Sequence, residues 1–234
     1  MSGPTWGWMR TGEEVVAEAV RGLDDPAITE PSRLPDWTRG HVVTHLARNA
    51  DALRNLLDWG RTGVDHPMYP SRQARAADIE AGASRPAAEQ RADLSAAAAR
   101  LADELDAYPP SRWDVQVRGG TTGRIMPVRE VPWLRVRELW LHAVDLDVGV
   151  PLSAMPDGVA ERLCAENLTS YAARDDVPGV VVTVLPGGRP TRLGGGSAVE
   201  VRGTAQELVG WLTGRSRDVP TVDGSPAPVL PPWL

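Results

Sequence analysis

The sequence contains neither lysine nor phenylalanine, so arginine supplies all 25 of its basic residues. Isoleucine and asparagine are also scarce, and the depleted amino acids share codons rich in A and T. This bias predicts a GC-rich genome rather than a constraint on the fold. The formal net charge is −6, and no basic stripe stands out along the chain. That charge distribution argues against nucleic acid as the main partner.

Cysteine and long apolar runs are the other shortages. Cys164 is the only cysteine, so a disulfide within the chain is excluded and we expect this thiol to pack in a core. The sequence has no run of about twenty apolar residues, which excludes a membrane span. The start, MSGPTWGWMRTGEE, lacks the basic-then-apolar order of a signal peptide. We therefore expect a cytoplasmic protein with no membrane partner, whose 234 residues form one large or two modest domains.

Two long amphipathic helices are predicted in the first 63 residues. Residues 11–23 have helical apolar spacing, and Thr11 with Glu14 forms a capping-box pattern that would begin this helix. Residues 36–63 are the longest periodic segment, with Thr38 as the expected N-cap and Gly63 at the expected end. One face of this second helix would carry Val42, His45, Leu46, Asn49, Leu53, Leu56 and Leu57.

Two further long helices follow. Residues 84–108 predict a helix capped by Ser84 and stopped by Pro109 and Pro110. Residues 128–146 predict a helix with Pro132 near its first turns. A shorter helix is expected over residues 70–82. Four long amphipathic segments with short connections predict a four-helix bundle.

Residues 113–128 predict a small hairpin or irregular loop that turns at Gly119 and Gly120. The pattern changes after about Pro151. Residues 155–175 predict another helix, and β-type runs follow at 179–186 and 197–203, separated by turn-rich sequence. Thr204 would cap a closing helix, with Glu207 at the box position, before an irregular, proline-rich tail.

We therefore expect fold class α+β. An N-terminal four-helix bundle would occupy residues 1–150, and a small α/β domain would occupy residues 151–234.

The chemistry-bearing residues gather on two of the predicted helices. Glu138 and His142 lie four residues apart in the otherwise apolar stretch RELWLHAVDL, so a helix puts both on one face. His45 lies in the apolar face of the second helix, whereas His41 is near its start and is expected to cap the helix or meet solvent. Side chains that project inward from facing helices form the metal sites of bundles. Three nitrogen and oxygen ligands with one open position are typical of catalytic zinc.

A purely structural interpretation is also available. Glu138 could pair with Arg135 or Arg48, and His142 could be a hydrogen-bonded core residue. From the residues alone both interpretations stay open.

Three segments resemble the mycothiol-dependent maleylpyruvate isomerase family. They are LPDWTRGHVVTHLARNADALRNLLDWGRTG, HPMY and RVRELWLHAVDL, and the resemblance extends over nearly the whole chain. Members of this family have a DinB-type four-helix bundle followed by a small α/β domain. The resemblance implies that His45, Glu138 and His142 are zinc ligands.

The resemblance also implies that Arg215, in the TGR that ends the last helix, is important for activity. Such an arginine would come from the small domain, close over the bundle site and bind a substrate carboxylate. Without the resemblance, Arg215 would be interpreted as a charge at a helix C-terminus. Arg75, in the helix after HPMY, is a second candidate for binding a carboxylate, with a solvated surface arginine as the alternative.

The implied function is a zinc- and mycothiol-dependent isomerase. It would convert maleylpyruvate to fumarylpyruvate by adding a thiolate to the cis double bond, allowing rotation, and eliminating the thiolate. One alternative is a mycothiol S-transferase that joins the thiol to an electrophile. Another is a non-catalytic zinc-binding sensor or interaction protein, which would favour a closed site with a fourth ligand such as His41.

Overall fold

The computed structural model describes residues 3–119 and 123–233. The chain divides into two compact units, Met1–Val150 and Pro151–Leu234, and each is described by itself. Among the described residues, no helix combines the length and the apolar character that crossing a bilayer requires.

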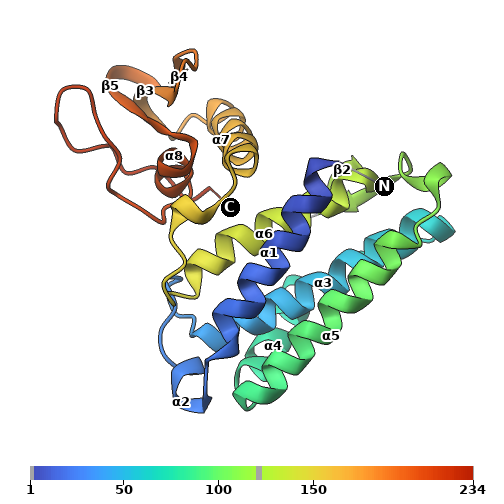
Figure 1. The fold of residues 1–234 in the computed structure, drawn as a ribbon. Coiled ribbons are helices and arrows are strands. Elements are labelled where there is room, and N and C mark those ends of the chain that lie inside the picture. Colours follow the sequence, from blue (N-terminus) through green and yellow to red (C-terminus); the bar gives the residue numbers. More distant parts are fainter. Residues whose placement is uncertain (1–2, 120–122, 234) are drawn as a thin grey trace. The chain divides into compact units, whose positions relative to one another are not determined.

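The first unit is built on four long helices. They are α1 (Pro4–Arg21), α3 (Arg39–Thr62), α5 (Ala87–Asp106) and α6 (Val131–Asp145). Helix α1 packs against α5 and α6, and α3 packs against the same two helices, so the four close into a bundle (Figure 1). The predicted bundle is confirmed. Its core is formed by the apolar faces of all four helices, with α3 the most deeply buried.

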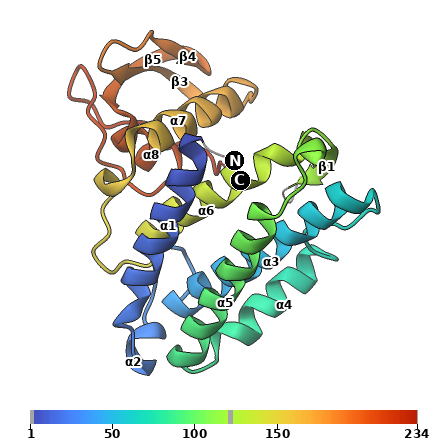
Figure 2. The ribbon, with the colours of Figure 1, turned by 45° about the vertical axis from the view of Figure 1, so that its right-hand side comes forward.

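Shorter elements complete this unit. They are α2 (Asp25–Ile28), α4 (Arg72–Ala83), the 3-10 turns η1 (Pro110–Arg112) and η2 (Val128–Glu130), and the strands β1 (Gln116–Gly119) and β2 (Arg124–Pro127). Helix α4, the predicted shorter helix, packs along α3 (Figure 2). Strands β1 and β2 pair antiparallel, as the hairpin prediction requires. Gly119 is the last residue of β1, and the predicted turn position Gly120 lies outside the described residues.

Helix α3 has the ends that its sequence predicts. The backbone N–H of His41 donates to Oγ1 of Thr38, and Nδ1 of His41 accepts from the backbone N–H of Thr38, 3.1 Å away. This reciprocal arrangement is a capping box that satisfies two donors at the helix start. At the other end Gly63 has φ +79°, the left-handed conformation that glycine adopts without strain.

Two predicted helix starts are wrong. Helix α1 begins at Pro4, so Thr11 lies inside it and caps nothing; a proline in the first turn needs no N–H partner there. Ser84 is the C-cap of α4 rather than the N-cap of α5. Pro86 disfavours helical backbone at the residue before it, so the chain breaks there and α5 begins at Ala87.

The second unit combines helices with a three-stranded sheet. Its elements are η3 (Leu152–Ala154), α7 (Asp157–Ala172), β3 (Pro178–Leu185), β4 (Thr191–Leu193), β5 (Gly195–Thr204) and α8 (Ala205–Leu212). The strand order is β4-β3-β5, with β4 antiparallel and β5 parallel to β3. Strand β4 lies in the stretch predicted as turn only, so that prediction is incomplete. Helix α8 is capped by Thr204 and Glu207 as predicted.

A buried arginine links three helices of the bundle. Arg135 on α6 has no exposed surface, and its guanidinium donates to both carboxylate oxygens of Glu13 on α1, at 2.7 and 3.2 Å. The same group donates to the carbonyl oxygen of Leu46 and to Oδ1 of Asn49 on α3, at 2.7 and 3.0 Å. A buried charge is tolerated only when it is paired and hydrogen-bonded, as here.

We expect Glu13→Ala to lower the free energy of unfolding of the bundle by about 2–4 kcal/mol, because it leaves the buried guanidinium without its counter-charge. The measurement is the denaturant transition followed by helical circular dichroism. Its matched control is Glu14→Ala, on the exposed side of the same helix, which we expect to stay within about 0.5 kcal/mol of the parent. Equal effects of the two substitutions would contradict the proposed importance of the Arg135 pair.

Candidate metal centre

Three side chains converge between α3 and α6. Nε2 of His45 lies 2.8 Å from Oε2 of Glu138, and Nε2 of His142 lies 3.3 Å from the same oxygen. One ligand atom from each residue falls within 4.8 Å of the other two. The two imidazole rings are 4.6 Å apart and nearly perpendicular. The structure thus brings together the three residues that the sequence singled out.

Helical periodicity explains this convergence. His45 belongs to the buried face of α3, next to Val42 and Leu46. Glu138 and His142 are one turn apart on α6, which packs against α3. The side chain of His45 is 4% exposed, and those of Glu138 and His142 are 18% and 13% exposed. The cluster is therefore held by the core and reachable from one side.

Asp145 supports the cluster, and sequence analysis did not assign it this role. Its carboxylate is fully buried, and Oδ2 lies 2.8 Å from Nδ1 of His142. A carboxylate on the far nitrogen fixes the orientation of an imidazole and directs Nε2 toward the metal position. The available signal was the spacing, because Asp145 follows His142 by three residues on one helix face.

Arg75 on α4 reaches the opposite side of the cluster. Its Nη2 lies 3.1 Å from Nδ1 of His45, and its guanidinium lies over the ring of Tyr69, 5.6 Å from the centroid. A guanidinium can only donate, so Nδ1 of His45 accepts and its Nε2 carries the proton that points at Glu138. Arg75 is thus half-buried against the cluster and is not a solvated surface residue.

His41 lies outside the cluster. Besides capping α3, it places Nε2 at 3.1 Å from Oε2 of Glu80. The ring of Trp37 stacks on His41 at 6.1 Å and is tilted against His45 at 5.6 Å. Trp37 therefore covers one side of His45, a contact that sequence analysis missed.

The arginines of the structural interpretation are engaged elsewhere. Arg135 pairs with Glu13, while Arg48 pairs with Asp51 and Asp93. Among the described residues, Glu138 interacts with the two histidines and, at 3.7 Å, with Arg137, rather than with either of these arginines.

Arg215 belongs to the second unit. Helix α8 ends at Leu212, and Gly214 follows in the left-handed conformation, so Arg215 lies just beyond the helix. Its backbone N–H donates to the carbonyl of Gly210, and Nη1 donates to the carbonyl of Thr213 at 3.3 Å. The side chain is half-buried.

The three groups of the cluster differ in protonation. Burial lowers the pKa of His45 from 6.5 to about 4, and the hydrogen bond with Glu138 opposes this only in part. Burial also acts against charge on His142, but hydrogen bonds with Asp145 and Glu138 outweigh it and raise its pKa. For Glu138, burial would raise the pKa, yet hydrogen bonds from His142 and His45 hold it well below 4.5. An ionised carboxylate thus lies between an imidazole whose pKa is lowered by burial and one whose pKa is raised by its carboxylate partners.

This donor set suits a divalent metal such as zinc. Imidazole nitrogen and carboxylate oxygen are both zinc donors, and two histidines with one acidic residue form a known catalytic combination. The ionised Glu138 would supply negative charge, and Asp145 supplies the supporting carboxylate that metal-bound histidines usually have. The chemistry of the residues therefore fits a metal ion with one position left for a further ligand.

Comparison with known proteins gives matches over most of the first unit and over nearly the whole chain. Residues 9–147 match the family model described as the mycothiol maleylpyruvate isomerase N-terminal domain. The chain belongs to this family. The crystal structure of the mycothiol-dependent maleylpyruvate isomerase matches with a TM-score of 0.91 and 29% identity, covering 98% of this chain and 96% of that one. A mutant of that isomerase, with one histidine changed to alanine, matches with a TM-score of 0.93 at the same identity and coverage. No curated protein sequence matches significantly.

We expect the two clustered histidines of this family member to titrate far apart once metal has been removed with a chelator. His45 should stay neutral until the pH approaches 4, and His142 should stay protonated above 6.5. Since unfolded histidines titrate near 6.5, His45 reduces stability as the pH falls from 6.5 toward 4. His142 contributes stability that is present below pH 6.5 and is lost as the pH rises through the pKa that His142 has in the folded protein.

The measurement is an NMR titration of the imidazole nitrogens, with His45→Gln and His142→Gln used to assign the signals. Two imidazoles that both titrate near 6.5 would contradict the opposed environments described above.

Proposed function

We propose that this protein is a zinc- and mycothiol-dependent isomerase that converts maleylpyruvate to fumarylpyruvate. The observation that carries the proposal is the convergence of His45, Glu138 and His142 within 4.8 Å, in a chain whose first unit matches the isomerase family. The likeness to the solved isomerase over 98% of the chain supports the same conclusion.

His45, Glu138 and His142 would hold the zinc ion. When bound, zinc would supply a Lewis-acid position at which a thiol loses its proton, and mycothiol would supply that thiol for reversible addition to the substrate double bond. Because hydrogen bonds with Asp145 and Glu138 raise the pKa of His142, a metal ion would compete with a proton for its Nε2. Asp145 then keeps the remaining proton on Nδ1 and holds the ring in position.

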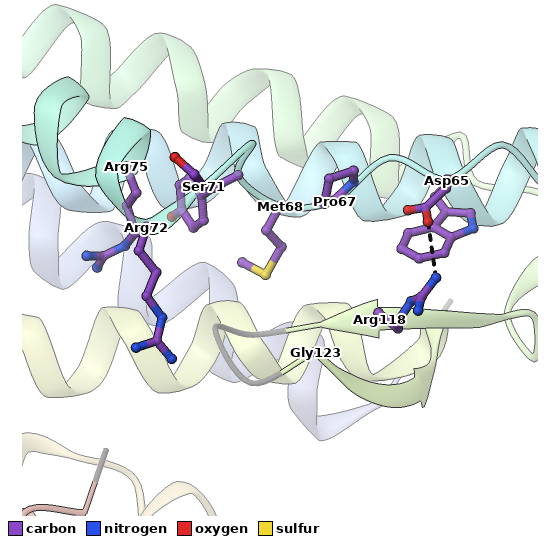
Figure 3. Close-up of a pocket in the computed structure, with 10 residues that line it drawn as sticks. Asp65, Pro67, Met68, Ser71, Arg72, Arg75, Arg118 and Gly123 are labelled. Atoms are coloured by element: carbon purple, nitrogen blue, oxygen red, sulfur yellow. Dashed lines mark hydrogen bonds and ion pairs between the residues drawn. The ribbon is translucent and has the colours of Figure 1, made fainter.

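Arg75 would bind a carboxylate of the substrate. Coordination through Nε2 of His45 puts the imidazole proton on Nδ1, which then faces the N–H groups of Arg75. Two donors repel each other, so the guanidinium must turn away from His45. Arg75 also lines a cavity beside the cluster (Figure 3). A guanidinium released toward this cavity is well suited to a carboxylate, which it can bind through two parallel hydrogen bonds.

Arg215 would bind another part of the dicarboxylate substrate and would be required for turnover. The support is its match to the arginine that the family uses for activity. A half-buried guanidinium after a helix end is chemically suited to this task.

We expect about one zinc ion per chain, and we expect His45→Ala and His142→Ala to lose it. Each substitution removes one of three ligands, and losing a ligand from so small a set leaves too few donors for tight binding. The measurement is metal analysis after exhaustive dialysis.

The control for this prediction is His41→Ala. His41 lies on the same helix as His45, but it caps the start of that helix and is not part of the cluster. Full metal content in both ligand variants would reject the assignment. Loss of metal in the His41 variant would indicate a closed site and favour a zinc-binding sensor.

We expect Arg215→Ala to keep its zinc but to lose activity. Losing a charge-assisted contact to the substrate should cost about 2–5 kcal/mol of transition-state binding. The assay compares kcat/KM and zinc content with those of Arg217→Ala, an exposed neighbour. Unchanged turnover in the Arg215 variant would indicate that Arg215 acts only as a favourable charge at the C-terminal end of the helix.

The function itself is tested by the rate of cis–trans isomerisation of maleylpyruvate with mycothiol, with a simple thiol, and without thiol. We expect turnover with mycothiol at neutral pH, little with the simple thiol, and none after chelation, because remote binding energy positions the sulfur. Equal rates in all three mixtures would exclude thiol-dependent catalysis. Consumption of thiol in step with product would instead identify an S-transferase, since an isomerase regenerates its thiol.

A further inference from the structure

The two histidines of the metal cluster differ in what holds their rings. Nδ1 of His142 lies 2.8 Å from the buried carboxylate of Asp145, and a carboxylate in this position fixes the ring of a metal-binding histidine. In the part of the chain that the structure describes, His45 has no such acceptor, because its Nδ1 faces Arg75, whose guanidinium can only donate. Coordination through Nε2 would put the remaining proton on Nδ1, and the contact with Arg75 would then be lost. Packing must therefore set the orientation of the His45 ring.

Trp37 supplies packing of this kind. Its half-buried indole lies 5.6 Å from the His45 ring, centroid to centroid, with 57° between the two ring planes. This separation is within the roughly 4.5–7 Å at which aromatic rings attract each other. Among the described residues, the only other ring in contact with His45 is that of His142, which belongs to the cluster itself. An imidazole that turned about its Cβ–Cγ bond would have to displace the indole or lose its contact with it.

The backbone of Trp37 is held in a closed turn. Its carbonyl oxygen accepts from the backbone N–H and from the Oγ hydroxyl of Ser32, at 2.9 and 2.8 Å, and its N–H donates to the carbonyl of Leu34 at 3.2 Å. The preceding residue, Asp36, has φ +63°, a left-handed conformation that aspartate tolerates better than most residues. Away from glycine, such a conformation persists where the surrounding contacts impose it. The turn therefore fixes the direction in which the indole of Trp37 points.

The same turn is anchored to the end of α6 that supports His142. The backbone N–H of Arg33, inside the turn, donates to the carbonyl of Asp145 at 2.9 Å. Arg39, which follows the turn, donates through Nε and Nη2 to the next two carbonyls after Asp145, at 3.0 and 3.1 Å. Carbonyls at the C-terminal end of a helix lack donors within the helix, so Arg39 satisfies groups that need a partner. The turn that carries Trp37 is thus fixed to the carboxylate that holds His142.

We propose that Trp37 is a positioning residue of the metal centre, and that its indole holds the imidazole of His45 with Nε2 directed at the metal position. Trp37 does for His45 by packing what Asp145 does for His142 by hydrogen bonding. The inference rests on the proposed function for the presence of zinc, but the ring contact is made by the chain alone. Removing the indole leaves all three ligands in place and frees one of them to turn, so bound zinc should dissociate faster. Groups that support a ligand in this way contribute roughly ten- to a hundredfold to metal affinity.

The first test is the rate at which zinc leaves the protein, followed with a chromogenic chelator in excess. We expect Trp37→Ala to release zinc about tenfold faster than the parent. Trp37→Phe keeps an aromatic ring against His45 and should stay within about twofold of the parent rate. The matched control is Trp6→Ala, which removes another half-buried tryptophan in a ring contact, with Trp113, and should release zinc at the parent rate. If Trp37→Ala does not fold, Trp37→Leu replaces it, because leucine keeps apolar bulk without a ring.

A second measurement separates this inference from the proposed function. In the chelated protein, Nε2 of His45 lies 2.8 Å from Glu138, and NMR can follow the exchange of its proton with water. We expect slow exchange in the parent and in Trp37→Phe, and exchange about tenfold faster in Trp37→Ala, whose imidazole can turn away from Glu138.

The outcomes are distinct. A parent that binds zinc and turns over, with zinc release and proton exchange both unchanged in Trp37→Ala, would overturn the inference and leave the function intact. Equal acceleration in Trp6→Ala would overturn it as well, because a general loosening of the bundle would then explain both variants. A parent that binds no zinc would reject the proposed function, and the proton exchange of His45 would then decide the inference alone.

Discussion

The buried guanidinium of Arg135 sets the position of α6 against α3, and the candidate metal centre depends on that position. Its donors reach Glu13, Asn49 and the carbonyl of Leu46. Leu46 directly follows His45, and Arg135 precedes Glu138 by one helix turn. The helices are thus fixed at the level of the ligand cluster itself. Sliding one helix along the other would separate a buried charge from its partners, which is costly in the low-dielectric interior. Apolar packing alone would tolerate small shifts that a metal site does not.

Hydrogen bonds with two imidazoles in different environments keep the buried carboxylate of Glu138 ionised. His142 has a second carboxylate, Asp145, on its far nitrogen, and its hydrogen bonds with Asp145 and Glu138 raise its pKa. Burial lowers the pKa of His45 to about 4, and the guanidinium of Arg75 on its far nitrogen acts in the same direction. A divalent ion held by two neutral imidazoles and one carboxylate would leave a net positive site, which favours an anionic fourth ligand such as a thiolate.

The sequence predicted the elements that carry the cluster because their signals are local. The cap at Thr38 and the left-handed Gly63 bound α3, and the four-residue spacing of Glu138 and His142 fixes their common face. The same kind of local signal failed at Thr11 and Ser84, where a capping pattern occurs inside or at the end of a helix. A Thr-x-x-Glu pattern has no cap to form where the preceding residues are already helical.

The supporting contacts could not be predicted in this way, because they join positions that are distant in the chain. Arg75 meets His45 across thirty residues, and Arg135 meets Glu13 across 122. Periodicity gives the face on which a residue lies but not the partner opposite, and an arginine side chain can reach several candidates. The sequence therefore left Glu138 with Arg135 and Arg48 as equal alternatives, which the pairing of both arginines elsewhere removes.

Arg75 lines the cavity and also contacts His45 in the cluster. Binding in the cavity can therefore affect binding at the cluster. Its contact with His45 favours the tautomer with the proton on Nε2, which is the nitrogen that a metal requires free. An anion in the cavity attracts the same guanidinium away from His45 and allows the proton to move to Nδ1. On the proposed function, a carboxylate in the cavity and a cation on the cluster therefore favour each other's binding, and the effect is reciprocal by linkage. Substrate binding would then strengthen the metal site at the step in which the thiol has to be ionised.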